Sequence, residues 1–197
     1  MRITGGEFKG KQIISKNQRD IHIRPTSGKV REAIFNLLAH GKFLNEVDWL
    51  TVENPSILED RVVADLYCGT GILGLEAFSR GAGTIIFADQ NDKSLKIAEK
   101  NVEEFRANDK CIFVRTDCDN LPTPPALIDI LFMDPPYDRN LVSKTLKSIK
   151  HANWLRDNGV IIVEHSKKEE IEEIKGLKIL DSRQYNNTVI TILKNCN

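Results

Sequence analysis

The sequence predicts an α/β protein with a doubly wound, mostly parallel seven-stranded sheet, an antiparallel C-terminal hairpin and a small N-terminal β-hairpin. Five short apolar, β-rich runs alternate with helical or loop segments, which is the pattern of βαβ units. The chain has 197 residues, of which 41% are hydrophobic, so it can bury one substantial core but not a second full-size domain. We therefore expect an N-terminal extension at 1–24 and a main domain at 25–197.

The N-terminal extension is predicted to be a hairpin that faces a polyanion. Between Arg2 and Ile14, two β-type runs are separated by glycine-containing turns. The whole chain is neutral, but residues 1–31 hold eight Lys or Arg against two acidic residues, a net charge of +6. This local excess suits nucleic acid, whereas a solvated surface of mixed charge is the alternative.

Residues 26–40 are predicted to form a helix. Apolar side chains recur there at helical spacing, and Thr26 or Ser27 can cap the first turn. Lys29 and Arg31 are expected to lie away from the buried stripe of this helix.

The sheet follows a segment at 41–60 that lacks a sustained period and is expected to be a loop with one short helix. The five parallel strands are expected at 62–67, 84–88, 111–115, 129–133 and 159–164. Two further runs, at 178–184 and 188–193, are joined by the short turn 185–187 and suit an antiparallel hairpin.

The first strand leads into a glycine-rich loop that can bind a nucleotide cofactor. In the motif that begins at Asp65, Gly69 and Gly71 stand where the chain must turn sharply and a ligand must approach the backbone. Asp89, at the end of the next strand, can accept both ribose hydroxyls. The spacing also matches the dinucleotide fingerprint, so nicotinamide and flavin cofactors remain open at this point.

Asp117 and Cys118, after the third strand, are candidates for binding the adenine of such a cofactor. The Asp117 carboxylate can accept the adenine amino group while the Cys118 backbone N–H meets a ring nitrogen. The alternative is that Asp117 only caps a turn.

The fourth strand runs into the candidate catalytic motif, which consists of Asp134, Pro135, Pro136 and Tyr137. The prolines restrict the backbone, so the Asp134 carboxylate and a main-chain carbonyl are held as two acceptors for a planar amine. These acceptors favour a pyramidal nitrogen whose lone pair can attack a methyl group, and Tyr137 can stack on the base. An ordinary proline-rich turn is the alternative.

Neither a metal centre nor a disulfide is expected, because the four cysteines show no CxxC pair and no His at a zinc-ligand interval. No apolar run is long enough to span a bilayer, and the N-terminus lacks the plan of a secretory signal. A soluble, cytoplasmic protein without a membrane partner is therefore expected.

Four stretches of the chain resemble the RsmD family of bacterial 16S rRNA (guanine-N2) methyltransferases, which have the class I methyltransferase variant of the Rossmann fold. They are residues 24–26, 30–36, 65–82 and 134–137, and the likeness runs from Arg2 to about Leu193. The resemblance implies S-adenosylmethionine as cofactor and a monomeric enzyme. It also implies methylation of the N2 amine of one guanine of 16S rRNA, with guanine 966 as the expected target, on the small ribosomal subunit or its assembly intermediate.

The resemblance also assigns roles to residues. The cofactor would be bound by Asp65, Gly69, Gly71, Asp89, Asp117 and Cys118, and the target base by residues 134–137. RNA contacts are expected from Arg2, Lys9, Lys11, Arg24, Lys29 and Arg31. For Arg24 and Arg31 a purely structural ion pair remains open. Cys68 is not expected to be catalytic, since direct transfer to an amine needs no covalent intermediate.

Other functions remain open on the sequence. The Asp134 motif also suits a DNA adenine-N6 methyltransferase, although such enzymes usually carry a larger target-recognition region. It suits a protein glutamine-N5 methyltransferase too, in which Asn is more usual at this position. A nicotinamide-dependent oxidoreductase would have no use for the motif, and an assembly factor that binds nucleotide without turnover would tolerate its loss.

Overall fold

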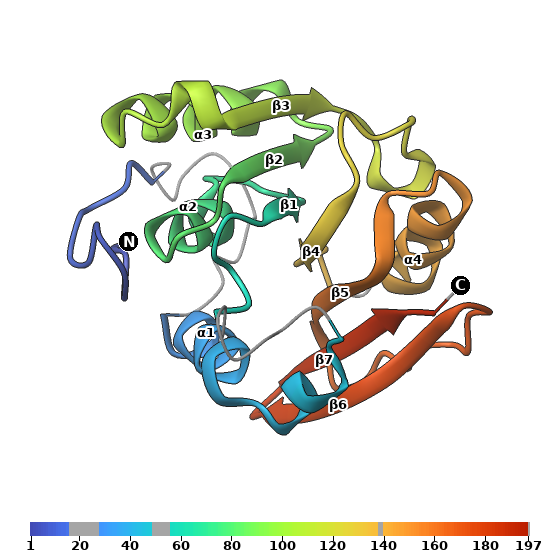
Figure 1. Ribbon diagram of the computed structural model, residues 1–197. Coiled ribbons are helices and arrows are strands. Elements are labelled where there is room, and N and C mark those ends of the chain that lie inside the picture. The colour runs from blue at the N-terminus through green and yellow to red at the C-terminus, as the bar shows by residue number, and fades with distance from the viewer. Residues whose placement is uncertain (16–27, 49–55, 138–139, 197) are drawn as a thin grey trace.

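The structure is a computed structural model that describes residues 1–15, 28–48, 56–137 and 140–196, and its centre is a seven-stranded sheet (Figure 1). The strands are β1 (Val62–Leu66), β2 (Thr84–Asp89), β3 (Cys111–Arg115), β4 (Ile128–Met133), β5 (Leu155–Ser166), β6 (Leu177–Tyr185) and β7 (Thr188–Asn195). The helices are α1 (Gly28–His40), η1 (Lys42–Glu46), α2 (Ile72–Ser79), α3 (Asp92–Glu104), η2 (Asn108–Lys110), η3 (Cys118–Asn120) and α4 (Leu141–His151). The predicted fold class is confirmed.

The sheet has the strand order β3-β2-β1-β4-β5-β7-β6. Strands β1 to β5 pair in parallel, whereas β7 is antiparallel to both β5 and β6. The order of the strands reverses between β1 and β4, and at such a point a crevice forms outside the carboxyl ends of the strands. The glycine-rich loop follows β1 and the Asp134 motif follows β4, so both motifs lie at this crevice.

Helices cover both faces of the sheet and divide the core into two clusters (Figure 1). Apolar residues of α1, α2 and α3 pack on one face, and those of α4 pack on the other. Successive strand residues alternate between the clusters, so Val63 of β1 lies in the first and Ala64 in the second. This burial on both faces explains why the parallel strands appear in the sequence as continuous apolar runs.

Two elements differ from their predicted extent. The N-terminal hairpin is reduced to one antiparallel bridge between Arg2 and Gln12. The ends of the segment bond to each other, for example Ile3 N to Lys11 O, whereas the N–H groups of residues 4, 5, 7 and 8 at its tip bond to α2. Strand β5 begins at Leu155, where it pairs with Ile128, and not at 159 as predicted. Residues 156–158 are polar, so the apolar pattern does not extend to the start of the strand. The capping residues expected at 26 and 27 lie outside the described residues, as do 49–55.

Glu76 on α2 fastens the N-terminal segment and α1 to the main domain. Its side chain is fully buried and accepts hydrogen bonds from Thr4 N at 2.8 Å, Thr4 Oγ1 at 2.7 Å, Gly5 N at 2.9 Å and Arg80 Nε at 2.9 Å. Arg31 Nε lies 3.5 Å from the same carboxylate. Since Arg31 is only 3% exposed, the expectation that it faces away from the buried stripe is wrong.

Among the helices of the described ranges, none is long and apolar enough to cross a membrane.

Candidate functional site

The glycine-rich loop turns from β1 into α2 through residues with positive φ. Gly71, the N-cap of α2, has φ 78° and ψ 18°, and a Cβ there would lie 3.1 Å from Phe87 Cε1. Its neighbour Gly69 has φ 55°, and a Cβ there would meet only the Tyr67 carbonyl, at 3.8 Å. The loop is therefore packed against β2 at Gly71 and open at Gly69, where a ligand can approach the backbone.

Asp65, at the end of β1, bonds to the first turn of α2 below the loop. It is 2% exposed, and its Oδ2 accepts a hydrogen bond from Gly74 N at 2.9 Å. Burial raises the pKa of the Asp65 carboxyl well above its usual value, and the carboxylates of Asp134 and Asp89 raise it further. Asp65 thus connects the end of β1 to the first turn of α2.

Asp89 places its carboxylate against the loop at the end of β2. Oδ2 accepts from Gly69 N at 3.1 Å, and Oδ1 accepts from Asn91 N at 2.8 Å. Each carboxylate oxygen can accept more than one hydrogen bond, so Asp89 retains acceptor capacity for a pair of hydroxyls. The two backbone bonds fix the direction in which the carboxylate points.

Asp117 and Cys118 lie where β3 passes into η3. Asp117 is exposed, and its Oδ1 accepts from Asp119 N at 3.1 Å, so it caps the turn as the alternative interpretation proposed. Cys118 is buried, and burial raises the pKa of its thiol to about 12. Burial likewise raises the pKa of the Cys68 thiol, so neither thiol is a thiolate nucleophile at neutral pH.

A hydroxyl network links the loops of the site, and no sequence motif indicates it. Tyr67 Oη lies 2.6 Å from Thr145 Oγ1 on α4, and the two oxygens lie 3.3 Å and 3.2 Å from Asp119 Oδ1, so the two hydroxyl protons are shared among three contacts. Tyr67 adopts φ 58°, which is unusual for a residue with a side chain. These bonds hold the strained residue and join the loops after β1 and β3 to α4.

The Asp134 motif lies directly beside the glycine-rich loop. Leu66 and Met133 are register partners, so the two motifs leave adjacent parallel strands at the same level. Pro135 is buried, whereas Asp134 and Tyr137 are partly exposed. The Tyr137 hydroxyl donates to Glu164 Oε1 at 3.0 Å. The carboxylate and the aromatic ring therefore belong to the segment that leaves β4 beside the glycine-rich loop.

Asn101 of α3 connects the N-terminal segment to the glycine-rich loop. Its fully buried carboxamide accepts from Ile14 N at 2.7 Å and donates to Ile14 O at 3.0 Å. It also donates to Thr70 O at 2.9 Å. Periodicity places Asn101 on the buried face of α3, but its two distant partners have no signature in the sequence.

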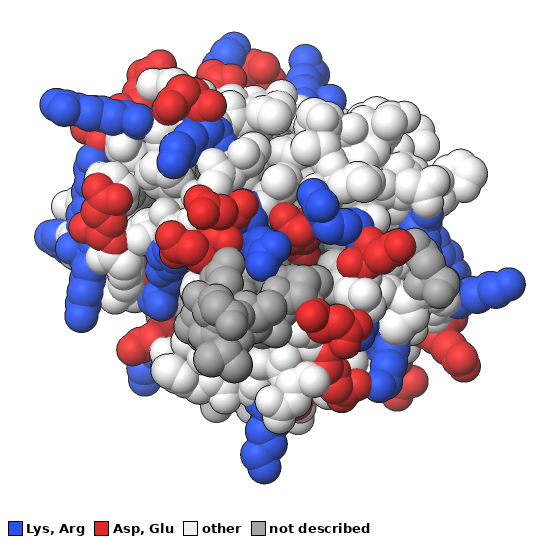
Figure 2. All heavy atoms as spheres, viewed as in Figure 1, with Lys and Arg blue, Asp and Glu red and all other residues white. Residues whose placement is uncertain are grey.

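The basic residues expected to bind RNA differ in their exposure to solvent. Arg2, Lys9 and Lys29 are exposed, Lys11 is partly exposed, Arg31 is buried against Glu76, and Arg24 lies outside the described residues. Lys11 Nζ lies 4.3 Å from the centroid of the Phe105 ring. Figure 2 shows acidic and basic side chains interspersed on one face, with basic side chains projecting on the left, where the N-terminal segment and α3 lie in Figure 1.

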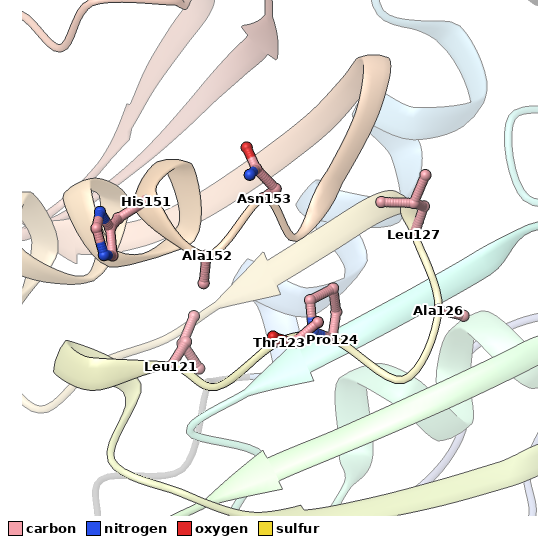
Figure 3. Close-up of a pocket in the computed structure, with 8 residues that line it drawn as sticks. All are labelled: Leu121, Thr123, Pro124, Ala126, Leu127, His151, Ala152 and Asn153. Carbon is pink, nitrogen blue, oxygen red and sulfur yellow. The ribbon is translucent and has the colours of Figure 1, made fainter.

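A separate hollow lies near the amino-terminal end of β4, away from the two motifs (Figure 3). Its lining comes from the loop before β4 and the segment after α4, namely Leu121, Thr123, Pro124, Ala126, Leu127, His151, Ala152 and Asn153. Because β4 runs from this loop toward Asp134, the hollow is at the amino end of the strand and is not part of the crevice. In the part of the chain that the structure describes, no group of His, Cys, Asp and Glu side chains could hold a metal ion.

The strand order and the two motifs at adjacent strand ends define the class I methyltransferase fold. A solved structure of the putative methyltransferase yhhF from Escherichia coli matches with a TM-score of 0.77 and 23% identity, covering 100% of this chain and 98% of that one. The putative methylase HI0767 from Haemophilus influenzae matches with a TM-score of 0.75 and 22% identity over the same shares. Both likenesses concern the fold.

The model of the family described as Conserved hypothetical protein 95 matches residues 1–194. The chain belongs to this family, the RsmD family that the motifs resemble. Ribosomal RNA small subunit methyltransferase D of Buchnera aphidicola (Acyrthosiphon pisum) is 31% identical over 172 residues, which are 86% of this chain and 80% of the relative. Putative rRNA methyltransferase YlbH of Bacillus subtilis is 28% identical over 98% of both chains.

Proposed function

We propose that this protein methylates the exocyclic N2 amine of a guanine in 16S rRNA, expected to be guanine 966, by direct transfer from S-adenosylmethionine. The observation that carries the proposal is the placement of the glycine-rich loop and the Asp134 motif at adjacent strand ends, where Leu66 pairs with Met133. The names of its relatives as small-subunit rRNA methyltransferases support an RNA substrate. Such a substrate places the protein in the cytoplasm, and we expect a monomer.

The residues at the glycine-rich loop fit S-adenosylmethionine. Asp89 presents only acceptors, which suits the two ribose hydroxyls, and the open backbone at Gly69 leaves room for the ligand. We propose that Asp117 and the Cys118 backbone bind the adenine. Asp117 would then accept a second hydrogen bond, in addition to the one from Asp119 N that caps η3. Asp65 would support this binding site by holding Gly74 in the first turn of α2.

Asp134 and its neighbours would prepare the guanine amine for attack. When bound, S-adenosylmethionine supplies an electrophilic methyl group. Asp134 accepts a hydrogen bond from the amine and stabilises the positive charge that develops on its nitrogen. A main-chain carbonyl of the motif, most simply that of Pro135, accepts the second amine hydrogen, and Tyr137 stacks on the guanine. These contacts orient the lone pair, which is otherwise delocalised into the base.

Alanine at Gly71 is expected to weaken the binding of S-adenosylmethionine about tenfold or more. A methyl group there would crowd Phe87 at 3.1 Å and strain a backbone with φ 78°, which by itself costs about 1–2 kcal/mol. Calorimetric titration with the cofactor measures the loss of affinity, and urea unfolding measures the cost of the strain. Gly10→Ala is the matched control, because Gly10 has φ 87° but open space around it. Equal cofactor affinity in both variants would contradict the role of Gly71.

Binding of RNA is expected to weaken steeply with salt, because we assign the N-terminal extension at 1–24 to phosphate contacts. Replacing exposed Lys9 by Gln should reduce the slope of log K against log salt by about one. Fluorescence anisotropy with a labelled rRNA hairpin between low and physiological salt measures this slope. Lys147→Gln on α4 serves as control, since it removes the same charge from a different element. An affinity independent of salt would refute the assignment.

The proposed function is tested with small ribosomal subunits that lack the modification. The protein is incubated with them and with labelled S-adenosylmethionine, the RNA is digested, and the methylated nucleoside is identified by mass spectrometry. N2-methylguanosine is the expected product. Transfer only to duplex DNA or to a release-factor peptide in parallel reactions would support the chemistry and overturn the substrate. Thermal stabilisation by a nicotinamide dinucleotide instead of S-adenosylmethionine would overturn the chemistry as well.

A further inference from the structure

The C-terminal hairpin reaches the Asp134 motif through the hydroxyl group of Tyr137. This oxygen lies 3.0 Å from Glu164 Oε1 on β5 and 3.0 Å from Thr188 Oγ1, at the start of β7. Glu164 is 6% exposed and Thr188 is 3% exposed, so both partners are buried. Neither residue belongs to a motif that the sequence reveals, and they are 27 and 51 positions from Tyr137.

The single phenol proton decides the direction of these two hydrogen bonds. Tyr137 donates to Glu164, which leaves its oxygen without a second proton to give. Thr188 must therefore be the donor in the contact with Tyr137. Burial raises the pKa of the Tyr137 phenol, so it remains protonated and can donate at neutral pH.

These bonds hold the ring of Tyr137 at both of its ends. The backbone end follows Pro135 and Pro136, which restrict the chain, and the hydroxyl end is anchored to two neighbouring strands. Loss of the hydroxyl contacts keeps the aromatic surface but allows the long axis of the ring to tilt. A stacked base would tilt with it, and small misplacements of a reacting atom reduce the rate strongly.

We propose that Thr188 is a positioning residue for methyl transfer, which donates to the Tyr137 hydroxyl and thereby fixes the long axis of the ring on which the target base stacks. This inference rests on the proposed function. It assigns the antiparallel hairpin a part in the substrate site, because Thr188 begins β7 immediately after the hairpin turn.

The test compares Thr188→Val, which keeps the shape but removes the donor, with Thr188→Ser, which keeps the donor. Thr188→Val is expected to lower kcat about tenfold, with KM for the RNA and the dissociation constant of S-adenosylmethionine changed less than twofold. Thr188→Ser should retain the wild-type kcat. A control, Thr191→Val, removes another buried β7 hydroxyl that bonds to His165 and Ser182, and it should not change kcat.

A double-mutant cycle separates positioning from a general structural role. If Thr188 acts through the Tyr137 hydroxyl, Tyr137→Phe lowers kcat to a similar extent, and the double variant is no slower than Tyr137→Phe alone. Losses that multiply in the double variant, an unchanged kcat in Thr188→Val, or an equal loss in Thr191→Val would each overturn the inference alone. If the wild-type protein binds S-adenosylmethionine but methylates no RNA, the proposed function fails, and this inference fails with it.

Discussion

Replacement of Asp134 by alanine is expected to lower the rate of methyl transfer by about 10²–10³-fold. The Asp134 carboxylate follows β4 directly and lies beside the glycine-rich loop, since Met133 is the register partner of Leu66. Its oxygen is the acceptor that we assign to the target amine, and the charge on that amine develops only during transfer. Because this contact strengthens in the transition state, its loss should appear in kcat more than in binding.

Three measurements distinguish this outcome from a loss of folding. Single-turnover transfer to small ribosomal subunits gives the rate, calorimetric titration gives the affinity for S-adenosylmethionine, and anisotropy gives the affinity for RNA. Both affinities should change less than about threefold, well below the expected loss of rate. Asp134→Asn keeps one acceptor oxygen but loses the charge, so its rate should lie between those of the wild type and Asp134→Ala.

Asp109→Ala provides a matched control, because it removes an exposed carboxylate in η2. Methylation by this variant should equal that of the wild type. Undiminished methylation by Asp134→Ala would remove Asp134 from the chemistry.

Replacement of Glu76 by alanine is expected to lower the free energy of unfolding by about 3–5 kcal/mol. The change leaves the buried guanidinium of Arg31 without its carboxylate and removes the acceptor from Thr4 and Gly5. Urea unfolding followed by circular dichroism measures the difference. Glu76→Gln, which keeps an acceptor oxygen but not the charge, should be destabilised less than Glu76→Ala.

The surface ion pair between Lys147 and Glu172 is the control for Glu76. These side chains are 60% and 63% exposed at a separation of 2.7 Å, so Glu172→Ala should cost less than about 1 kcal/mol. A loss from Glu76→Ala no larger than that of Glu172→Ala would mean that the buried cluster does not hold the N-terminal segment. A loss of methylation accompanied by full stability would also contradict this structural role.

The positions of the strands and of both motifs could be predicted from the sequence, because they depend on local patterns. An apolar run such as that of β4 must be buried on both faces, and the Gly-rich and Pro-rich segments beside it restrict the backbone residue by residue. The parallel connections then bring the ends of β1 and β4 together. The shared end of the two strands and the candidate catalytic carboxylate of Asp134 therefore follow from the sequence.

Contacts between distant residues could not be predicted in this way. The helical period predicts that Arg31 lies on the surface of α1, because the period treats every charged residue as polar. The period does not reveal that Glu76, 45 positions later, supplies a buried partner. Likewise, the helical period does not reveal that Asn101 forms hydrogen bonds with Ile14 and Thr70, which are distant in the sequence.

By itself, the sequence determined the fold class, the two motifs and their shared edge of the sheet, since each follows from the conformational preferences of neighbouring residues. Only the tertiary structure decided that Arg31 is buried, that Asp65 bonds to Gly74 N, and that Thr188 contacts Tyr137. These features depend on hydrogen bonds and ion pairs whose partners are set by strand register and helix packing. Sequences with the same apolar pattern could pair these polar groups with other partners.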